Sequence, residues 1–291
     1  MNMRQFSSMH THTLFCDGKD DPETMCRAAY EKNLCAIGFS AHAPVSGQTG
    51  IKTNWHVNEE RLGEYAQEVL AAKRRWQGKL AVYFGFEVDY IRGLRSPLDS
   101  DIKALSPDFL IGSVHYIVPA NGAAPFTVDG PPEEFEKGLA EGFGGNGEAL
   151  MHSYWDAVAE MTATGGFDIL GHIDIIKKNC QDKKYWPYES EMIRHAEIAR
   201  AAAGFVTEVN TGGLNRKKIT DTYPSLPFLR LLREQGGRVI ITADAHNAAD
   251  IDGNYDAALR NIVDAGFSDH VLFDGRINGK ANWKSVPIFL P

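Results

Sequence analysis

The feature that most constrains this chain is the repeated alternation of short apolar segments with longer segments of helical character. Seven of the apolar segments read as buried strands, and they span residues 6–9, 34–42, 80–90, 108–115, 167–174, 205–210 and 238–246. Strands that alternate with helices form a parallel sheet, because each helix returns the chain to the starting edge. The sequence therefore predicts an α/β fold. No Gly-x-Gly-x-x-Gly motif follows the first strand, so a dinucleotide-binding fold is not indicated.

Helix-boundary and turn residues define the segments between these strands. Asp21 followed by Pro22 is typical of a helix start, since aspartate accepts a hydrogen bond from a free backbone N–H and proline fits the first helical position. We expect a loop at 44–54, a long excursion at 119–147 that contains a short helix, and a short closing strand at 271–273. Helices are expected at residues 22–32, 57–77, 97–105, 132–139, 147–164, 189–203, 224–235 and 255–265.

Size, charge and cysteine usage limit the class of protein. The 291 residues, 43% of them hydrophobic, suffice for one barrel or two smaller domains, and because no linker divides the chain we expect a single domain over residues 1–291. The net charge of −8 argues against a nucleic-acid or acidic-membrane surface. We find no apolar run of transmembrane length, no signal-peptide core and no Cys-x-x-Cys pair among the four cysteines, so we expect a reduced, cytoplasmic protein.

Two histidines follow the first strand. His10 and His12 are two residues apart, so their side chains lie on the same face of an extended backbone, as in many metal sites. The pattern recurs, because six of the ten histidines lie at the carboxyl ends of predicted strands. In a (β/α) barrel these strand ends form the edge that carries the active site. The candidate metal ligands are His10, His12, Asp17, His42, Glu87, His115, His172, Asp244 and His246.

Each candidate has an ordinary structural alternative when it is considered singly. A histidine at a strand end is usually a hydrogen-bonded surface or core residue. Asp17 precedes Gly18 and could be a turn residue, and Glu87 could pair with an arginine. The joint pattern favours metal binding over these alternatives. The remaining histidines are expected to be surface or capping residues, and they are His56, His152, His195 and His270.

The ligand types indicate the metal. Imidazole and carboxylate without thiolate suit zinc, iron or manganese, and Cys16 has no second thiol nearby in the sequence. Nine ligands are too many for one catalytic ion with an open position. They suit two to three divalent transition-metal ions that share a bridging carboxylate.

Taken in order, the motifs around these residues resemble the polymerase-and-histidinol-phosphatase (PHP) superfamily, and within it the histidinol-phosphate phosphatases of the PHP type. The motifs are His-x-His with Asp17, Ser-Ala-His-Ala-Pro at His42, Gly-Phe-Glu at Glu87, Gly-Ser-Val-His-Tyr at His115, Gly-His-Ile-Asp at His172 and Asp-Ala-His at His246. The resemblance covers essentially the whole chain and implies a distorted (β/α)7 TIM-like barrel with three metal ions. The ligand sets it implies are His10, His12, Glu87 and Asp244; Glu87, His115 and His172; and Asp17, His42 and His246.

The chemistry of such a centre agrees with phosphate-ester hydrolysis. A hydroxide that bridges two cations is a nucleophile at neutral pH, and the cations offset charge on the phosphoryl oxygens. The leaving alkoxide needs a proton, which Asp244 or His246 could deliver. The resemblance places phosphate-binding basic residues, often arginines, near the loops that contain Lys177, Lys178 and Arg216. A lysine binds phosphate as a point charge and not as a fork, and a solvated lysine pair is the ordinary alternative.

We therefore expect a metal-dependent phosphatase that hydrolyses L-histidinol phosphate to L-histidinol and phosphate in histidine biosynthesis. One alternative is a PHP phosphoesterase for another ester, such as a nucleotide, a sugar phosphate or an oligonucleotide end. Another is a metal-loaded binding or regulatory module, against which the complete ligand set argues. The expected partner is a small phosphorylated substrate, and neither a membrane nor a nucleic acid is expected. The metal identity, the oligomeric state and the role of residues 119–147, which we expect to shape the leaving-group pocket, stay open.

Overall fold

The chain folds around a seven-stranded parallel sheet, as the alternation of segments predicts. The computed structural model describes residues 5–180 and 192–288. Every neighbouring pair in the sheet is parallel, and the strands follow one another across it in sequence order. The strands are β1 (Ser7–Ser8), β2 (Ala36–His42), β3 (Ala81–Asp89), β4 (Phe109–Ser113), β7 (Ile169–Leu170), β8 (Val206–Asn210) and β9 (Arg238–Thr242).

The two outer strands of this sheet, β1 and β9, are followed by segments that meet and nearly close the barrel. The N–H of His12 donates to the carbonyl of Ala245 at 2.9 Å, and the N–H of Ala245 donates to the carbonyl of His10 at 3.1 Å. The barrel is distorted, since β1 and β7 are each only two residues long. The expected distorted (β/α)7 barrel is confirmed, and its closure brings the first and last candidate ligands side by side.

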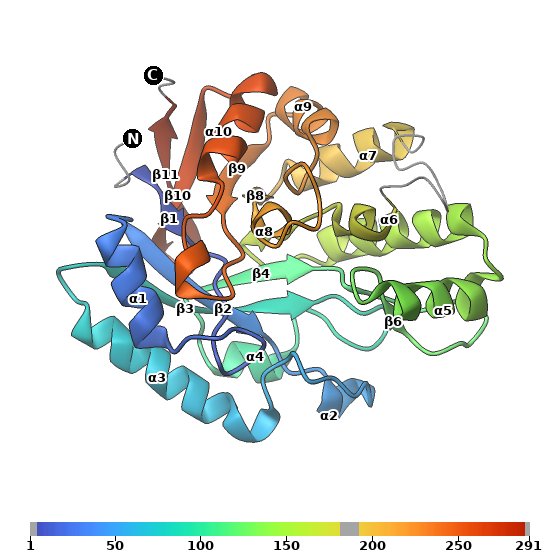
Figure 1. Cartoon of the computed structure of the whole chain (residues 1–291), viewed down its shortest axis with the longest axis horizontal. Helices are drawn as coiled ribbons and strands as arrows, with labels where there is room; N and C mark the ends of the chain where they lie inside the picture. Colours follow the sequence, from blue (N-terminus) through green and yellow to red (C-terminus); the bar gives the residue numbers. More distant parts are fainter. Residues whose placement is uncertain (1–4, 181–191, 289–291) are drawn as a thin grey trace.

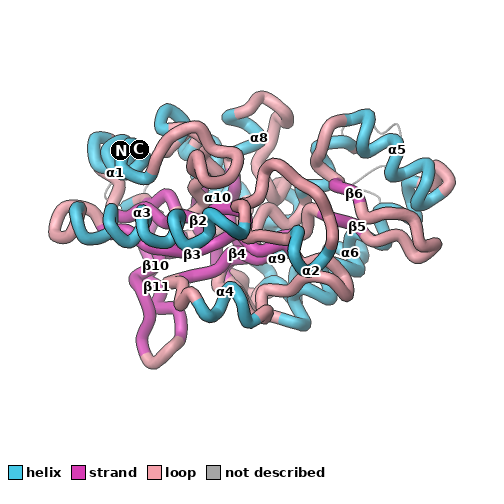
Figure 2. The backbone as a smooth tube through the Cα atoms, turned by 90° about the horizontal axis from the view of Figure 1, so that it is seen from below, coloured by secondary structure: helices cyan, strands magenta, loops and turns pink. Residues whose placement is uncertain are grey.

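Helices cover the outside of the barrel (Figures 1 and 2). The first begins where the sequence predicts, because the Asp21 side chain accepts a hydrogen bond from the Thr24 N–H at 2.7 Å. The helix predicted at 57–77 begins as a 3₁₀ turn, η2 (Glu59–Arg61), and the start expected at residue 189 lies outside the described residues. The helices around the barrel are α1 (Pro22–Glu31), α3 (Leu62–Arg75), α4 (Ser100–Ala104), α6 (Gly147–Thr164), α7 (Met192–Ala202), α9 (Leu226–Glu234) and α10 (Tyr255–Asp264).

The excursion after β4 consists of a small hairpin and a helix. β5 (Tyr116–Ile117) pairs antiparallel with β6 (Phe126–Thr127), and α5 (Pro132–Phe143) follows. Gly138 lies so close to the Phe126 ring that a Cβ would be 2.2 Å from it, so only glycine lets the helix dock on the hairpin at this distance. In Figure 1 this unit projects from the carboxyl-end side of the barrel, beside α6.

Short helices replace the loops expected after two strands. α2 (Ser46–Thr49) lies within 44–54, and α8 (Gly212–Asn215) replaces the glycine-rich turn after β8. A Cβ on Gly212 would lie 2.7 Å from Oδ2 of Asp244. The absence of a side chain therefore allows this loop to pass directly over the end of β9.

The described chain ends in an antiparallel hairpin, β10 (Asp269–Ile277) and β11 (Lys280–Pro287). Residues 271–273 form a strand as expected, but this strand is longer than predicted and belongs to a separate hairpin and not to the barrel sheet. Instead, Val271 and Phe273 pack with the first residues of β4, β7 and β8. The hairpin thus covers the amino-terminal end of the barrel with apolar side chains.

Two histidines expected at the surface belong to the core. His195 packs against the Trp155 ring with 4.7 Å between centroids, and His270 stacks on Phe6 at 5.2 Å. Both are almost fully buried, whereas His152 is exposed as expected. The expectation is wrong for the first two because an aromatic neighbour from a distant segment covers each ring.

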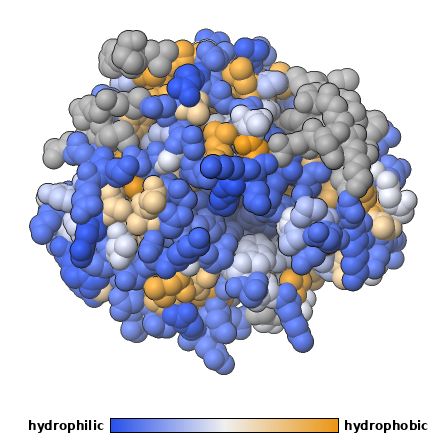
Figure 3. Space-filling model, viewed as in Figure 1, coloured by the Kyte–Doolittle hydropathy of each residue, from blue (hydrophilic) through white to orange (hydrophobic). Residues whose placement is uncertain are grey.

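One face of the molecule is mostly polar on its surface. Hydrophilic residues predominate on the face seen in Figure 3, where hydrophobic residues form small separate areas. Within the part of the chain that the structure describes, we find no helix with the length and hydropathy needed to cross a membrane.

Candidate metal centre

The nine candidate ligands converge at the carboxyl end of the barrel. Parallel strands bring their carboxyl ends to one edge, and barrel closure gathers that edge into a ring. Seven of the nine are buried, while Asp17 and His246 lie on the open side. Their positions are after β1 for His10, His12 and Asp17, within or at the end of β2 and β3 for His42 and Glu87, after β4 and β7 for His115 and His172, and after β9 for Asp244 and His246.

Glu87 lies in the middle of the cluster. Its Oε2 is 3.0 Å from Nε2 of His10 and 3.0 Å from Nδ1 of His42, while its Oε1 is 2.9 Å from Nε2 of His172. The two oxygens face different sets of imidazoles, as a carboxylate that bridges two cations requires. The imidazole nitrogens within 3.6 Å of this carboxylate belong to His10, His12, His42, His115 and His172.

Two more carboxylates complete the cluster. Oδ2 of Asp17 is 3.1 Å from Nε2 of His246, and its Oδ1 is 3.8 Å from Nε2 of His42. Oδ1 of Asp244 is 3.3 Å from Nε2 of His12. The groups that could hold an ion are His12, Asp17, His42 and His246; His10, His12 and Asp244; His10, Glu87 and His172; and His42, Asp89 and His115. Because several histidines belong to two groups, the ligands form one continuous cluster.

Several atoms of the cluster lack a hydrogen-bond partner. Among the described residues, none satisfies Nε2 of His12, Nδ1 of His42 or Oε1 of Glu87, although all three atoms are buried. These atoms approach other ligands closely but not along hydrogen-bonding directions. A buried unsatisfied polar atom costs about 1–3 kcal/mol, and a cation would remove this cost. The residues present therefore fit a metal centre with nitrogen and oxygen ligands.

The cluster keeps its carboxylates ionised. Burial alone would raise the pKa of Glu87, but the imidazoles of His10 and His42 help to hold it well below its usual range. The pKa of Asp244 is also well below its usual range, because Arg216 and His10 outweigh the effect of burial. The site therefore attracts cations, whether these are protons on imidazoles or metal ions.

A buried carboxylate that the sequence analysis did not single out holds two of the ligands. Glu208, in β8, lies 2.8 Å from Nδ1 of His10 and accepts hydrogen bonds from the His172 N–H and the Thr242 hydroxyl. Such a partner sets the ring orientation and tautomer of a ligating histidine. The signal in the sequence is a glutamate inside an otherwise buried strand.

Asp89 holds the opposite side of the cluster. Its Oδ1 is 2.8 Å from Nδ1 of His115, and its Oδ2 is 2.8 Å from Nε2 of His56. Burial would lower the pKa of His115, but Asp89 and Glu87 raise it to about 10. His56 was expected at the surface and is instead a buried neighbour of the centre. Asp89 follows Glu87 by two residues and so shares its face of β3, which is the signal for its role.

Arg216 lies at the edge of the cluster. Its Nη2 is 3.0 Å from Oδ2 of Asp244, and its Nη1 is 3.0 Å from Nδ1 of His246. The side chain is 36% exposed and lines the cavity above the ligands. A guanidinium in this place can donate to an anion in the cavity.

The two lysines proposed for phosphate binding are both engaged by the protein. Lys177 is buried, its ammonium is 3.0 Å from Oδ2 of Asp174, and it does not line the cavity. Lys178 does line the cavity, but its ammonium donates to the carbonyl of Asp129 and lies 3.7 Å from the Asp129 carboxylate. The structure thus brings Arg216 to the cluster and gives the lysines internal partners.

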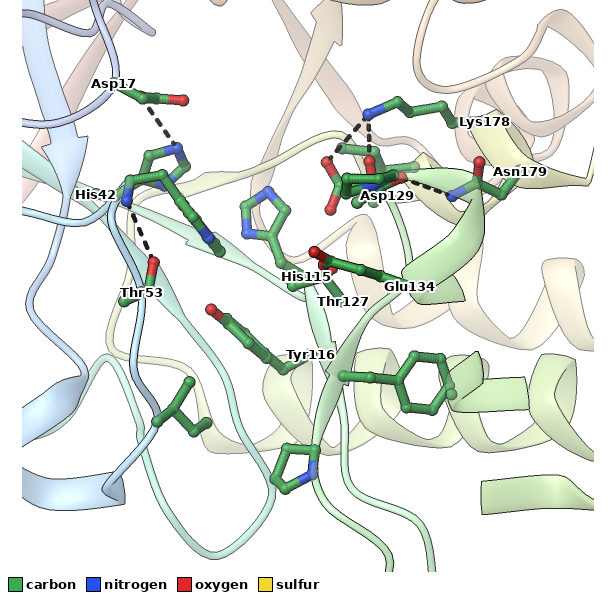
Figure 4. A pocket seen from close by; sticks show the side chains of 18 of the residues that line it. Asp17, His42, Thr53, His115, Tyr116, Thr127, Asp129, Glu134, Lys178 and Asn179 are labelled. Atoms are coloured by element: carbon green, nitrogen blue, oxygen red, sulfur yellow. Dashed lines mark hydrogen bonds and ion pairs between the residues drawn. The ribbon is translucent and has the colours of Figure 1, made fainter. Parts of the chain in front are cut away.

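A cavity of about 1150 Å³ opens over the ligand cluster. Figure 4 shows His115, Tyr116 and Glu134 directed into it from one side and His42 from the other. A cavity of this size suits a small molecule with one end at the cluster. The part of the lining that we call the outer wall consists of Trp55, Tyr116, Phe126, Thr127, Asp129 and Glu134.

The fold and the site together define a barrel protein with a carboxylate-centred cluster able to hold several metal ions. The chain belongs to the PHP domain family, whose model matches residues 8–212. The matched range contains seven of the nine candidate ligands, and Asp244 and His246 lie beyond it.

Two curated relatives agree with this placement, and a solved structure agrees with the fold. The "Probable histidinol-phosphatase" of Deinococcus radiodurans is 27% identical over 260 residues, with 88% of this chain and 92% of the relative covered. The histidinol-phosphatase of Bacillus subtilis is 26% identical over 267 residues, with 86% and 97% covered. A histidinol phosphate phosphatase of Lactococcus lactis, solved with zinc, L-histidinol and phosphate, superposes with a TM-score of 0.64 at 22% identity, covering 96% of this chain and 99% of that one. The structural likeness supports the barrel fold.

Proposed function

We propose that this chain is a metal-dependent phosphomonoesterase that hydrolyses L-histidinol phosphate to L-histidinol and phosphate. The observation that carries the proposal is the position of Glu87, whose two oxygens face separate sets of imidazoles beneath a cavity of small-molecule size. The names of the relatives and the ligands of the Lactococcus lactis structure support the choice of substrate. A place in histidine biosynthesis follows from this substrate.

We propose that the cluster holds two to three divalent ions of zinc, iron or manganese. When bound, such ions activate water and offset negative charge on the phosphoryl oxygens. Glu208 and Asp89 would hold the rings of His10 and His115 in the orientation that ligation needs. The proposed ligand sets are His10, His12, Glu87 and Asp244; Glu87, His115 and His172; and Asp17, His42 and His246.

Residues at the edge of the cluster would bind the phosphoryl group and manage protons. Arg216 would donate two N–H groups to phosphoryl oxygens, which orients phosphorus for attack by water. The bond between phosphorus and the ester oxygen would then break, and the alkoxide would take a proton from His246, whose pKa is raised by Asp17 and Asp244. Asp244, the other proposed donor, is held ionised and could give a proton only after taking it from the attacking water. The side chain of His246 is 19% exposed against 5% for Asp244, so it lies nearer the open side where the leaving group departs. Lys177 is left out of the phosphate site because its ammonium is committed to Asp174.

The proposal extends to the whole chain. We propose that residues 1–291 act as one domain in the cytoplasm. All four cysteines are free, which suits a reducing compartment.

The test is a phosphatase panel on protein loaded with manganese, iron or zinc. The panel compares histidinol phosphate with nucleoside monophosphates, sugar phosphates and single-stranded DNA ends, and Glu87→Gln serves as the inactive control. The highest kcat/KM for histidinol phosphate would support the proposal. A clear preference for another ester would refute the substrate but keep the phosphatase. No hydrolysis above the control would instead favour a binding module.

A further inference from the structure

The outer wall of the cavity has an aromatic part next to the ligand cluster. The rings of Trp55 and Tyr116 are stacked, with 5.6 Å between centroids and 9° between planes. The Trp55 ring also meets the His42 ring edge-on at 4.6 Å. An aromatic wall, of which Trp55 is the more exposed part and Tyr116 the buried part, therefore continues outward from one of the proposed ligands. Such a surface suits the flat ring of a leaving group.

The same wall carries two carboxylates, and one of them is compensated by the protein. The ammonium of Lys178 lies 3.7 Å from Oδ2 of Asp129 and also donates to its carbonyl. The side-chain amide of Asn179 donates to the carbonyls of Val128 and Gly130 at 2.8 and 3.2 Å. Lys178 and Asn179 thus fasten this stretch of the excursion to the barrel, and the charge of Asp129 is balanced locally.

The second carboxylate, Glu134, has no such partner within residues 5–180 and 192–288. It stands in the first turn of α5 and lines the cavity, and among the described residues its carboxylate has neither an ion pair nor a hydrogen bond. Figure 4 shows it directed toward His115 and Tyr116. Glu134 is exposed and therefore places a negative charge, without an ion-pair partner in the described part of the chain, beside the aromatic surface.

An acidic residue in the first turn of a helix also has a structural explanation, since it interacts favourably with the helix dipole. Glu133 occupies the same turn of α5 but does not line the cavity. The dipole therefore explains both residues equally, whereas only Glu134 presents its charge to a bound molecule.

We propose that Glu134 makes the cavity selective for phosphate esters of amino alcohols, by binding the ammonium group of the leaving alcohol while an attached ring lies on Trp55 and Tyr116. This inference rests on the proposed phosphatase function and adds the residue that recognises the leaving alcohol. L-Histidinol carries both an ammonium group and a flat imidazole ring. Its phosphate ester thus matches the charge and the shape of the outer wall.

The test compares histidinol phosphate with its N-acetyl derivative, which keeps the ring and the phosphate but lacks the positive charge. kcat/KM is measured for both esters with metal-loaded wild type, Glu134→Gln and Glu133→Gln. We expect the wild type to prefer the amine form and Glu134→Gln to reduce this preference about five- to tenfold, since water partly screens the exposed pair. Glu133→Gln loses the same charge from the same helical turn and should keep the wild-type preference.

An unchanged preference in Glu134→Gln would overturn the inference, as would an equal loss of kcat/KM for both esters. A wild type that prefers some other phosphate ester would refute the proposed substrate without deciding the role of Glu134. In that case the same ratio is measured with phosphoethanolamine and its N-acetyl form. An enzyme that makes no distinction between those two esters, or accepts neither, contradicts the inference as well.

Discussion

Nδ1 of His10 lies 2.8 Å from Oε2 of Glu208, and both side chains are fully buried inside the barrel. With Nδ1 engaged, Nε2 of His10 faces Glu87 at 3.0 Å. The pair thus directs one particular nitrogen of a proposed ligand toward the centre of the cluster.

Replacing Glu208 by glutamine should weaken metal binding about 10- to 100-fold, because the neutral amide holds the His10 ring less firmly and lowers its basicity. Metal titration and elemental analysis measure the effect, and circular dichroism checks that the variant folds. Thr242→Val is the matched control, since it removes one donor to Glu208 and keeps the charge. Wild-type affinity in Glu208→Gln would refute this positioning role.

Protein purified without chelators should contain two to three transition-metal ions per chain, because nine nitrogen and oxygen ligands meet in one cluster. Elemental analysis before and after reconstitution with manganese, iron or zinc measures this ratio. A single ion, or none, under all three conditions would count against a multinuclear centre.

Glu87→Gln should reduce turnover more than His42→Ala does. A bridging carboxylate contacts two ions and offsets their mutual repulsion, so its loss disturbs both, whereas a terminal ligand affects one. Turnover and metal content of the two variants decide the order. Near-wild-type values for Glu87→Gln would show that the carboxylate does not bridge.

Arg216→Ala should lower kcat/KM about 10- to 100-fold, since a charge-assisted pair with phosphate contributes roughly 1.5–3 kcal/mol. Inhibition by inorganic phosphate should weaken in parallel, while metal content stays the same. Lys217→Ala is the control, because Lys217 is exposed and does not line the cavity. Unchanged kcat/KM and phosphate affinity in Arg216→Ala would remove this residue from the site.

His270 should make the protein less stable in mild acid. Burial lowers its pKa to about 4, so the folded protein keeps the ring neutral while the unfolded chain binds a proton below about pH 6.5. The free energy of unfolding therefore falls as the pH drops from about 6.5 to 4. Below about pH 4 His270 is protonated in both states and lowers the stability no further. Between pH 7.5 and 5.0 the wild type should lose about 2 kcal/mol more than His270→Phe, which keeps the stacking on Phe6. Urea unfolding at both pH values measures this, and an equal loss in both proteins would contradict it.

The sequence by itself determined the fold class and brought all nine candidate ligands to attention. Helix 147–164 was predicted with both of its bounds, and Asp21 caps the first helix as expected. These features are local, because helix ends and buried strands leave their marks in neighbouring residues. The ligands were found for a related reason. Polar residues ending apolar strands must meet once those strands are parallel.

Only the tertiary structure decided what each side chain contacts. It showed that Glu208 and Asp89 contact the candidate ligands His10 and His115, that His56 lies beside Asp89, and that Lys178 is engaged by the excursion. It also placed the final hairpin under the barrel and not in its wall. Glu208 and His10 are 198 positions apart in the chain, and no local pattern encodes such a pair. Their contact exists because barrel closure brings the segment after β1, which contains His10, close to β8, which contains Glu208, and to β9.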